Sequence, residues 1–389
     1  MRALTSEWDA AWAESLARLD EDGLLRRLRT FERLGPKVRT PGGRDLVNLC
    51  SNDYLGLSQH PALAEAAARA AHERGTGATA SRLVVGNDPA YERLEERLAE
   101  WKGTGAALVL ASGYAANVGI IPALAGRGDA IYSDELNHAS IVDGCRLSRA
   151  DVHVYGHLDV GHLEELLERT RPRRRLIVTE TVFSMDGDAA PLRELAELRD
   201  RFGAALLVDD AHGAGVVGPH GEGYAHAVGV AEHVDLHLGT FSKAFGGYGA
   251  YVAGRRDWIR HLQNACRSLI YSTGLPPPVV AAAAAALELV RDADDARDAL
   301  RRKAERFRAR LVELGLDVSG SSTQIVPVCV GEPERALALS AELEERGVLC
   351  VAIRPPTVPP GTSRLRFSLT ATHEDADLER ALEAVADAS

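Results

Sequence analysis

Short apolar runs alternate with amphipathic segments along most of the chain, from residue 51 to about 271. The apolar runs predict strands at 106–110, 130–132, 152–155, 176–179, 204–208, 236–238 and 250–253. A helical period between them predicts helices at 62–74, 91–101, 163–169 and 192–202. Because repeated strand–helix alternation builds a parallel sheet between layers of helices, we expect an α/β fold, mostly parallel, with helices on both faces of the central sheet.

The pattern changes at both ends of this alternating region. Residues 7–34 predict an amphipathic, charge-rich helical region, and a short strand follows near 46–49. After three consecutive prolines at 276–278, an Ala-rich and then Arg-rich helical stretch runs from about 279 to 314. The remaining sequence predicts strands at 325–330, 348–353 and 364–369, and helices at 333–346 and 374–386. We therefore expect an N-terminal helical segment with a short strand (1–50), a large α/β domain (51–279) and a small C-terminal α+β domain (280–389).

Composition and charge narrow the class of protein. The chain has 389 residues, 46% of them hydrophobic, which is enough to bury a sizeable core. Its 56 acidic residues outnumber 45 basic ones, so the net charge of −11 repels nucleic-acid phosphates and anionic membrane surfaces. The uncharged stretch 103–126 is rich in Ala and Gly and divides into a strand, a turn and a helix, so we do not expect a membrane span there.

The cysteines indicate the compartment. Five cysteines are scattered along the chain without a CxxC pair, which favours free thiols over a disulfide framework or a zinc site. The N-terminus has no continuous apolar segment of the kind found in signal peptides. We expect a cytoplasmic protein without a bound metal.

Polar residues follow several of the predicted strands, at the edge where ligands collect in sheets of this kind. Ser112, Gly113 and Tyr114 form a turn before a helix, whose free N–H groups suit a phosphate; a plain tight turn explains them equally well. Asn137 and His138 follow another strand. The imidazole could stack on a flat cofactor ring, or it could cap a helix.

A pair of acids ends the strand at 204–208. Asp209 and Asp210 are followed by His212, and glycines free the backbone beyond. A buried carboxylate there needs a cationic partner, which the protonated ring nitrogen of a cofactor would provide. A metal is the rival interpretation, but no further ligand lies at a suitable local spacing.

Lys243 follows the next predicted strand and lies between small hydroxyl residues and glycines. A lysine at such a place can form a Schiff base with an aldehyde, while the hydroxyl groups of Thr240 and Ser242 hold a phosphate. A lysine considered alone is more often a solvated charge.

Together these features are the separate requirements of pyridoxal 5'-phosphate (PLP): a phosphate turn, a carboxylate for the ring nitrogen and a Schiff-base lysine. The sequence resembles fold-type I PLP-dependent transferases, and within them the α-oxoamine synthases, from Gly23 to His373. The resemblance rests on five separated runs, at 51–57, 209–212, 240–246, 271–273 and 353–359. The last run favours the branch of this family that works in biotin biosynthesis.

The resemblance implies a role for each matching residue. Lys243 would bind PLP covalently, and Asp209 would pair with the ring nitrogen. His138 would stack on the ring and border the substrate, while His212 and Ser184 would hydrogen-bond its phenolic oxygen.

The remaining matches concern the phosphate and the substrates. The resemblance assigns the phosphate to the backbone at Gly113 and Tyr114 and to Thr240 and Ser242, helped by Ser272 and Thr273 from the second subunit of a homodimer. It assigns the amino-acid carboxylate to Asn52 and Arg354, and the acyl substrate to Arg26 and Thr357. The implied reaction is a decarboxylative condensation of L-alanine with a pimeloyl thioester, carried on CoA or on an acyl carrier protein.

Other interpretations stay open at this point. A sister α-oxoamine synthase would use glycine or serine with a different acyl-CoA. A non-catalytic scaffold subunit of the same fold need not keep Lys243, Asp209 and His212, all of which are present. The glycines within 75–80 follow a helix and so lack the context of a dinucleotide site, and the histidines at 153, 157 and 162 are better explained as loop residues than as a metal cluster.

Overall fold

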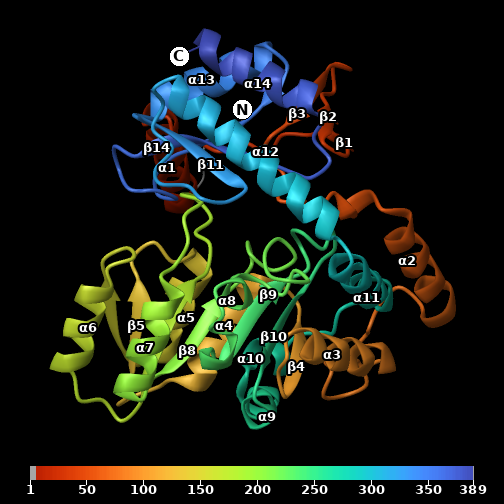
Figure 1. Ribbon diagram of the computed structural model, residues 1–389, viewed down its shortest axis with the longest axis vertical. Coiled ribbons are helices and arrows are strands. Elements are labelled where there is room, and N and C mark those ends of the chain that lie inside the picture. The colour runs from red at the N-terminus through yellow and green to blue at the C-terminus, as the bar shows by residue number, and fades with distance from the viewer. Residues whose placement is uncertain (1–5, 389) are drawn as a thin grey trace.

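The computed structural model describes residues 6–388. Its centre is a seven-stranded sheet in the order β4-β10-β9-β8-β7-β5-β6, in which only β10 runs antiparallel to its neighbours (Figure 1). All seven predicted strands lie in this sheet, so the α/β prediction is confirmed. The strands are β4 (Ala106–Leu110), β5 (Ala130–Asp134), β6 (Asp151–Tyr155), β7 (Arg175–Glu180), β8 (Ala205–Asp209), β9 (Leu236–Thr240) and β10 (Ala250–Gly254).

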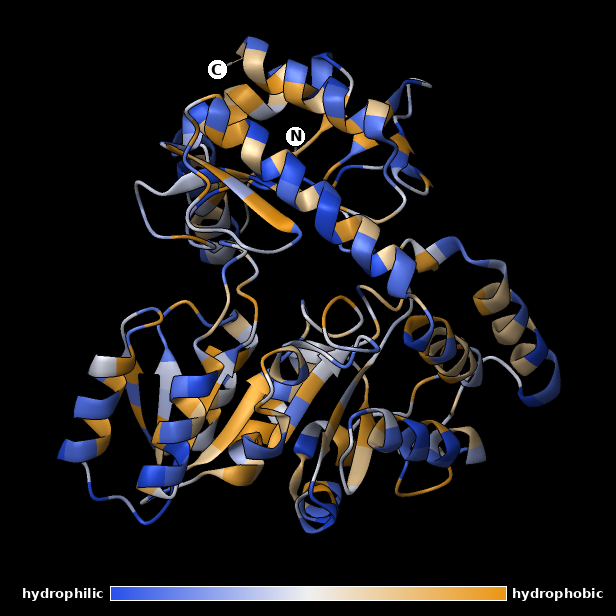
Figure 2. Ribbon diagram, in the orientation of Figure 1, coloured by the Kyte–Doolittle hydropathy of each residue, from blue (hydrophilic) through white to orange (hydrophobic). Residues whose placement is uncertain are grey.

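Helices cover both faces of the sheet because its strands are apolar on both sides. Along β7, Val178 packs into one apolar cluster with α4, α5 and α9, while Ile177 packs into another with α6 and α7. Each such side chain, once fully buried, stabilises the fold by about 1.5–3 kcal/mol. Figure 2 shows the result: β8 is largely orange, and the surrounding helices are striped blue and orange. The helices of this part are α2 (Pro61–Arg74), α3 (Pro89–Trp101), α4 (Gly113–Leu124), α5 (Ala139–Ser148), α6 (Val160–Arg169), α7 (Leu192–Phe202), α8 (Tyr224–Ala227), α9 (Arg256–Ala265) and α10 (Arg267–Ile270), with short 3-10 turns at Leu57–Gln59 and Ala231–His233.

The two ends of the chain share a second region of the molecule. A four-stranded sheet has the order β1-β2-β3-β12, and β12 from the C-terminal part pairs in parallel with β3 from the N-terminal part. In Figure 1 the red and blue segments therefore lie together at the top. A three-stranded antiparallel sheet, β11-β14-β13, lies in the same region. The elements are α1 (Glu7–Glu21), β1 (Glu32–Leu34), β2 (Lys37–Arg39), β3 (Asp45–Asn48), α11 (Pro277–Arg291), α12 (Asp294–Glu313), β11 (Ile325–Gly331), α13 (Pro333–Glu345), β12 (Val348–Leu349), β13 (Val351–Ile353), β14 (Ser363–Ser368) and α14 (Asp375–Ala388).

Three sequence expectations differ from the structure in detail. The helical region expected at 7–34 ends at Glu21, because Gly23 turns the chain with φ +65°, and residues 32–39 form a hairpin around Gly35, at φ +70°. The stretch at 279–314 is two helices, since α11 packs on α2 and α12 on α14. The run at 348–353 divides at Cys350 into β12 and β13, which belong to different sheets.

Within residues 6–388, no helix combines the length and the apolar character that a bilayer crossing requires.

Candidate active site

The carboxyl ends of β8 and β9 bring an amine and an imidazole together. Lys243, just beyond β9, places its Nζ 2.9 Å from Nε2 of His212, which follows β8. Burial lowers the pKa of the Lys243 amine to about 8, although the charges of Asp209 and Glu180 act in the opposite direction. Burial also lowers the pKa of His212 well below its ordinary value, so this imidazole is neutral. The site therefore holds an amine that loses its proton close to neutral pH.

A chain of hydrogen bonds runs from Asp209 to His138. Asp209 ends β8 and is buried; its Oδ2 accepts from Nδ2 of Asn117 at 2.7 Å. The same Asn117 nitrogen donates to Oγ of Ser140 at 2.9 Å, and that hydroxyl lies 2.8 Å from Nδ1 of His138. His138 is the N-cap residue of α5, and burial lowers its pKa, partly offset by the charge of Asp209. Hydrogen bonds therefore connect Asp209, the predicted partner of the ring nitrogen, to His138, the predicted stacking residue.

Glu180, a buried carboxyl group at the end of β7, lies beside this network. It is the register partner of Asp209 on the adjacent strand, and its Oε1 has no hydrogen-bond partner among the described residues. Burial, with the negative charge of Asp209, raises the pKa of Glu180 to about 8. Glu180 is therefore mostly protonated at neutral pH, which leaves Asp209 as the carboxylate available for a cation.

The predicted phosphate turn lies against the hydroxyl residues near Lys243. Gly113 and Tyr114 open α4, so their N–H groups have no carbonyl within the helix, and Gly113 faces the side chain of Thr240. The hydroxyl of Thr240 lies 2.8 Å from that of Ser242. Two free N–H groups and two hydroxyls thus come together from separate strand ends. This arrangement suits an anion, as at other helix N-termini.

An arginine that the sequence analysis did not single out lies in the same site. Arg366, on β14, is 7% exposed and donates from both terminal nitrogens to Oδ1 of Asn52, at 3.2 Å each. Tyr54 also donates to that oxygen, and its hydroxyl lies 2.6 Å from Nδ1 of His212. The charge of Arg366 contributes to the low pKa of both His212 and Lys243. In the sequence, Arg366 is one of two arginines that alternate with apolar residues in the strand-like run 364–369.

Arg354, the other predicted carboxylate partner, has different contacts. Its Nη1 donates to the backbone carbonyl of Gly23, and Nη2 of Arg26 lies 3.4 Å from the carbonyl of Pro355. Burial, and then the charge of Arg26, lowers the pKa of Arg354. Thr357 lies in the same loop and is exposed. The structure therefore groups Arg26, Arg354 and Thr357 with each other, whereas Asn52 is bonded to Arg366.

The last three predicted residues occupy loops. Ser184 follows β7 and is buried; its carbonyl accepts from Nε of Arg366. Ser272 and Thr273 follow α10, and Thr273 forms a bridge with Ser81 in a second loop. Their predicted role toward a partner subunit stays a prediction.

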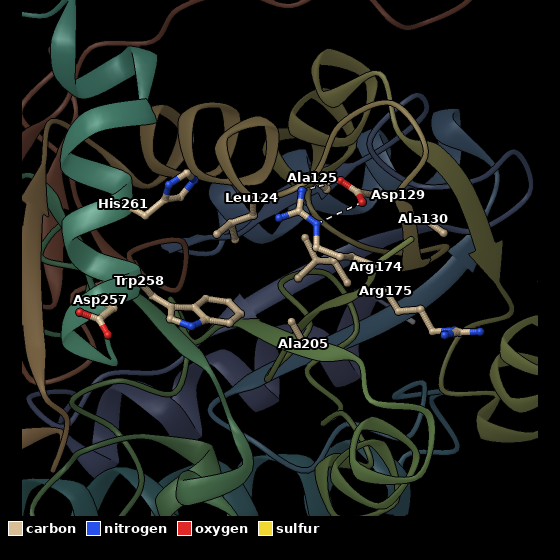
Figure 3. A pocket seen from close by; sticks show the side chains of 11 residues that line it. Leu124, Ala125, Asp129, Ala130, Arg174, Arg175, Ala205, Asp257, Trp258 and His261 are labelled. Carbon is tan, nitrogen blue, oxygen red and sulfur yellow. Dashed lines mark hydrogen bonds and ion pairs between the residues drawn. The ribbon is translucent and has the colours of Figure 1, made fainter. Parts of the chain in front are cut away.

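A separate cavity of about 330 Å³ lies at the opposite edge of the sheet (Figure 3). It is bordered by Arg175 and Ala205, at the amino ends of β7 and β8, and by Trp258 of α9. In Figure 3, Arg174 reaches across its rim to Asp129. Because Lys243 and Asp209 lie at the carboxyl ends of the strands, this cavity is distinct from the candidate active site.

The three histidines at 153, 157 and 162 have separate partners. His157 bridges Asp134 and Asp188, His162 accepts from a backbone N–H, and His153 stacks on Tyr132. Across the described part of the chain, no group of three or more His, Cys, Asp or Glu side chains is arranged to hold a metal ion.

Comparison with known proteins identifies the family. The family model for aminotransferase class I and II matches residues 44–385. An 8-amino-7-oxononanoate synthase from Anaeromyxobacter dehalogenans is 54% identical over 381 residues, which cover 98% of this chain and 95% of the relative. The chain belongs to the 8-amino-7-oxononanoate synthase family. It is therefore a PLP-dependent acyltransferase of fold type I, an α-oxoamine synthase of biotin biosynthesis, as the sequence motifs predicted.

Solved structures agree with this family assignment. A structure of serine palmitoyltransferase with PLP as its internal aldimine superposes with a TM-score of 0.92 at 32% identity, covering 100% of this chain and 98% of the other. The 8-amino-7-oxononanoate synthase of Francisella tularensis gives a TM-score of 0.78 at 27% identity, covering 88% of this chain and 97% of that one. The site described above fits PLP, since it offers an anion cradle at Gly113, a buried carboxylate at Asp209 and an amine at Lys243.

Proposed function

We propose that this chain condenses L-alanine with a pimeloyl thioester to give 8-amino-7-oxononanoate, CO₂ and a free thiol. One observation carries the proposal: the Lys243 amine lies beside His212, interacts electrostatically with Asp209 and has a pKa of about 8. Relatives at 54% identity bear the name of this activity, which supports it further.

Four of the predicted residues illustrate how the site would hold the cofactor. PLP, when bound, supplies an electron sink for the negative charge that develops at the amino-acid Cα. Lys243 would bind it covalently, and Asp209 would keep its ring nitrogen protonated, because a carboxylate stabilises a neighbouring cation. The N–H of Gly113 and the hydroxyl of Thr240 would bind the phosphate.

Lys243 would also move the proton. With a pKa of about 8, roughly a tenth of the amine is neutral at pH 7, and a base is most effective when its pKa lies near the working pH. Nζ of Lys243 would take the Cα proton of alanine; Cα then bonds to the acyl carbon as the C–S bond breaks, and the departing thiolate takes up a proton from solvent to give the free thiol. Loss of CO₂ breaks the Cα–carboxyl bond, and the proton returns to Cα.

Arg366 and Asn52 would orient the amino acid. A guanidinium fork grips a carboxylate through two parallel hydrogen bonds and so fixes which Cα bond faces the base. Asn52 and Arg354 were assigned this task by the sequence motifs, but the guanidinium that contacts Asn52 is that of Arg366. Comparing Arg366→Met with Arg354→Met distinguishes the two: the variant of the carboxylate partner raises the KM for L-alanine, and the other variant leaves that KM unchanged.

The far end of the acyl chain would meet a second pair of cations. A pimeloyl chain ends in a carboxylate, and Arg26 lies close enough to Arg354 to lower its pKa. An anion placed between two arginines relieves their mutual repulsion. Thr357, in the same loop, would add a hydroxyl donor. This grouping supports a dicarboxylic acyl donor over an unsubstituted fatty acyl chain.

A homodimer with shared active sites is part of the proposal. Thr273 and Ser81 bring two loops together, and Val84, Val85 and Tyr271 on these loops are each more than 70% exposed. Apolar side chains exposed in this way favour burial against another copy of the chain. Light scattering of the purified protein tests the oligomer, and mixing an inactive Lys243→Ala chain with a Thr273→Ala chain tests whether one competent site is restored across subunits.

A cytoplasmic location also remains a proposal. All five cysteines are free thiols, and burial raises the pKa of Cys50 and Cys145 to about 12. Such thiols are unreactive, as expected of a protein kept in a reducing compartment.

Product analysis tests the reaction itself. Purified, PLP-loaded protein is incubated with L-alanine and pimeloyl-CoA, or pimeloyl carrier protein, and the product is identified by mass spectrometry. We expect 8-amino-7-oxononanoate, which the Lys243→Ala variant fails to form. Lys243→Ala should also lose the visible absorbance of bound PLP; a variant with full turnover would refute the assignment.

A sister α-oxoamine synthase is the second candidate, because the match to serine palmitoyltransferase has the higher TM-score. A matrix of alanine, glycine and serine against pimeloyl-CoA and palmitoyl-CoA separates the two. Turnover with serine and palmitoyl-CoA, but not with alanine and pimeloyl-CoA, would replace our proposal. Absence of turnover on every pair would instead favour a non-catalytic scaffold subunit.

A further inference from the structure

Asn117 connects two halves of the candidate active site through one amide group. It lies in the second turn of α4 and is 1% exposed. Its Nδ2 donates one hydrogen to Oδ2 of Asp209 at 2.7 Å and the other to Oγ of Ser140 at 2.9 Å. Its Oδ1 has no hydrogen-bond partner among the described residues. Both donors of the amide are used, and its acceptor is not.

The orientation of this amide follows from its partners. If the group were rotated by half a turn, Oδ1 would face the carboxylate of Asp209, and two acceptors would repel each other. A buried oxygen without a hydrogen-bond partner destabilises the fold. The two hydrogen bonds that the Asn117 amide donates must therefore account for an asparagine at this position. Its bond to a carboxylate is charge-assisted and stronger than an ordinary amide hydrogen bond.

The other branch reaches His138. The backbone N–H of Ser140 donates to Nδ1 of His138 at 3.2 Å, so this ring nitrogen carries no proton. The hydroxyl of Ser140, which accepts from Asn117, lies 2.8 Å from the same Nδ1 and can only donate to it. His138 is therefore neutral, with its hydrogen on Nε2. Asn117 therefore donates to Ser140, and Ser140 donates to His138.

We propose that Asn117 is a positioning residue, which aligns the Asp209 carboxylate with the ring nitrogen of PLP and fixes the His138 ring through Ser140. The inference rests on the proposed roles of Asp209 and His138 and names the group that couples them. Asn117 touches no reacting atom, so it acts only through these two residues. A purely structural asparagine would affect stability but would not change how PLP affinity depends on pH.

Asn117→Asp tests this distinction. Two carboxyl groups within hydrogen-bond distance share a proton, so their pair has a raised pKa. Below that pKa the introduced carboxyl is protonated and still donates to Asp209; above it, two negative charges repel and Asp209 loses its donor. The sign is therefore fixed: PLP binding approaches that of the wild type at low pH and weakens as pH rises.

The measured quantity is the ratio of the PLP Kd of a variant to that of the wild type, from fluorescence titration of the apo proteins between pH 5.5 and 8.5. Taking the ratio removes the pH dependence that Lys243 gives to every protein in the series. For Asn117→Asp we expect the ratio to rise from about one to between roughly tenfold and a hundredfold, the range for a lost charge-assisted hydrogen bond. For Asn117→Leu we expect a similar loss at every pH.

Asn48→Asp is the matched control. Asn48, the last residue of β3, is also buried, but its Oδ1 accepts from the backbone N–H of Cys50, and its side chain has no hydrogen bond to a carboxylate among the described residues. The ratio of its PLP Kd to that of the wild type should stay near one from pH 5.5 to 8.5. If Asn117→Leu fails to fold, as judged by circular dichroism, the pH series of Asn117→Asp still decides the question.

The outcomes separate this inference from the proposed function. A flat ratio for Asn117→Asp overturns the inference. Asp209→Asn, measured in parallel, tests the proposed function, which predicts weaker PLP binding for it. If Asp209→Asn weakens binding while the Asn117 variants do not, the inference alone fails. If Asp209→Asn binds PLP as tightly as the wild type, the proposed role of Asp209 fails first.

Discussion

His157 forms a half-buried clamp that joins the end of β5 to the loop after β7, and its removal should destabilise the protein. Nδ1 lies 2.9 Å from Oδ1 of Asp134, and Nε2 lies 2.9 Å from Oδ2 of Asp188. Because both carboxylates only accept, both ring nitrogens carry a proton and the ring is cationic. The His157 ring also packs edge-on against Phe183, with the two ring centroids 4.4 Å apart. Since Asp188 belongs to the loop that carries Ser184, the clamp holds this part of the site in place.

The pKa of His157 gives the size and direction of the effect. Burial would lower it, but the hydrogen bonds and charges of Asp134 and Asp188 outweigh burial and raise it to about 10 from its ordinary 6.5. At about 1.4 kcal/mol per pH unit, this rise corresponds to at most about 5 kcal/mol of folding free energy. Because the folded-state pKa is raised, the stabilisation is fully present below pH 6.5 and is lost as the pH rises toward 10.

His157→Gln removes the titrating cation but leaves both carboxylates. Urea unfolding of the wild type and the variant, at fixed protein and PLP concentrations, should show the largest stability difference at pH 6. We expect this difference to shrink by about 3–5 kcal/mol by pH 10. His233→Gln is the control, because His233 contacts Asp200 at the surface with both side chains about half exposed, so its loss should cost about 0.5 kcal/mol or less. A difference between wild type and His157→Gln that stays constant from pH 6 to 10 would show that the clamp is not charged.

Two further predictions concern the amine and the turn beyond β8. The rate at which apo protein binds PLP should rise with pH, with a midpoint near pH 8, because only the neutral Lys243 amine attacks an aldehyde. Arg366→Met should shift this midpoint upward in stopped-flow absorbance, because the charge of Arg366 lowers the pKa of Lys243. An unchanged or lower midpoint would contradict the electrostatic argument. Gly223→Ala should destabilise the protein by about 3 kcal/mol or more, since φ is +113° and the new methyl group would overlap the Asp210 carboxylate. Gly229→Ala, at φ +74° in open space, should cost only about 1–2 kcal/mol, so equal losses in thermal unfolding would refute the steric reasoning.

The local hydrophobic pattern predicted the strands of the central sheet correctly, because a strand buried on both faces is apolar at successive residues. The central strands are apolar on successive residues, as strands covered by helices must be, and each was found within a residue or two of its bounds. The pattern failed between residues 22 and 34, where charged and apolar residues mimic a helical face although Gly23 ends the helix. It could not show that 348–353 joins two different sheets, because pairing partners lie far away in the chain.

In the candidate site, too, residues with a local sequence pattern were predicted and residues defined by long-range contacts were missed. Asp209, His212 and Lys243 were found because each follows an apolar strand, where a polar residue is out of place. Arg366 was missed because an arginine in a strand usually marks a solvent-facing position, and only its contact with Asn52 shows otherwise. Asn117 resembled any small polar residue in a helix, although the carboxylate that it holds lies 92 positions along the chain.

The sequence by itself determined which chemical groups stand at the strand ends, and with them the fold class, the cofactor and the family. Those features are local, because a strand and the residue after it are adjacent in the chain. The tertiary structure decided which arginine meets Asn52, which carboxyl keeps its proton and how far the pKa of Lys243 falls. These properties depend on burial and on distances between segments that only folding brings together, so no reading of neighbouring residues contains them.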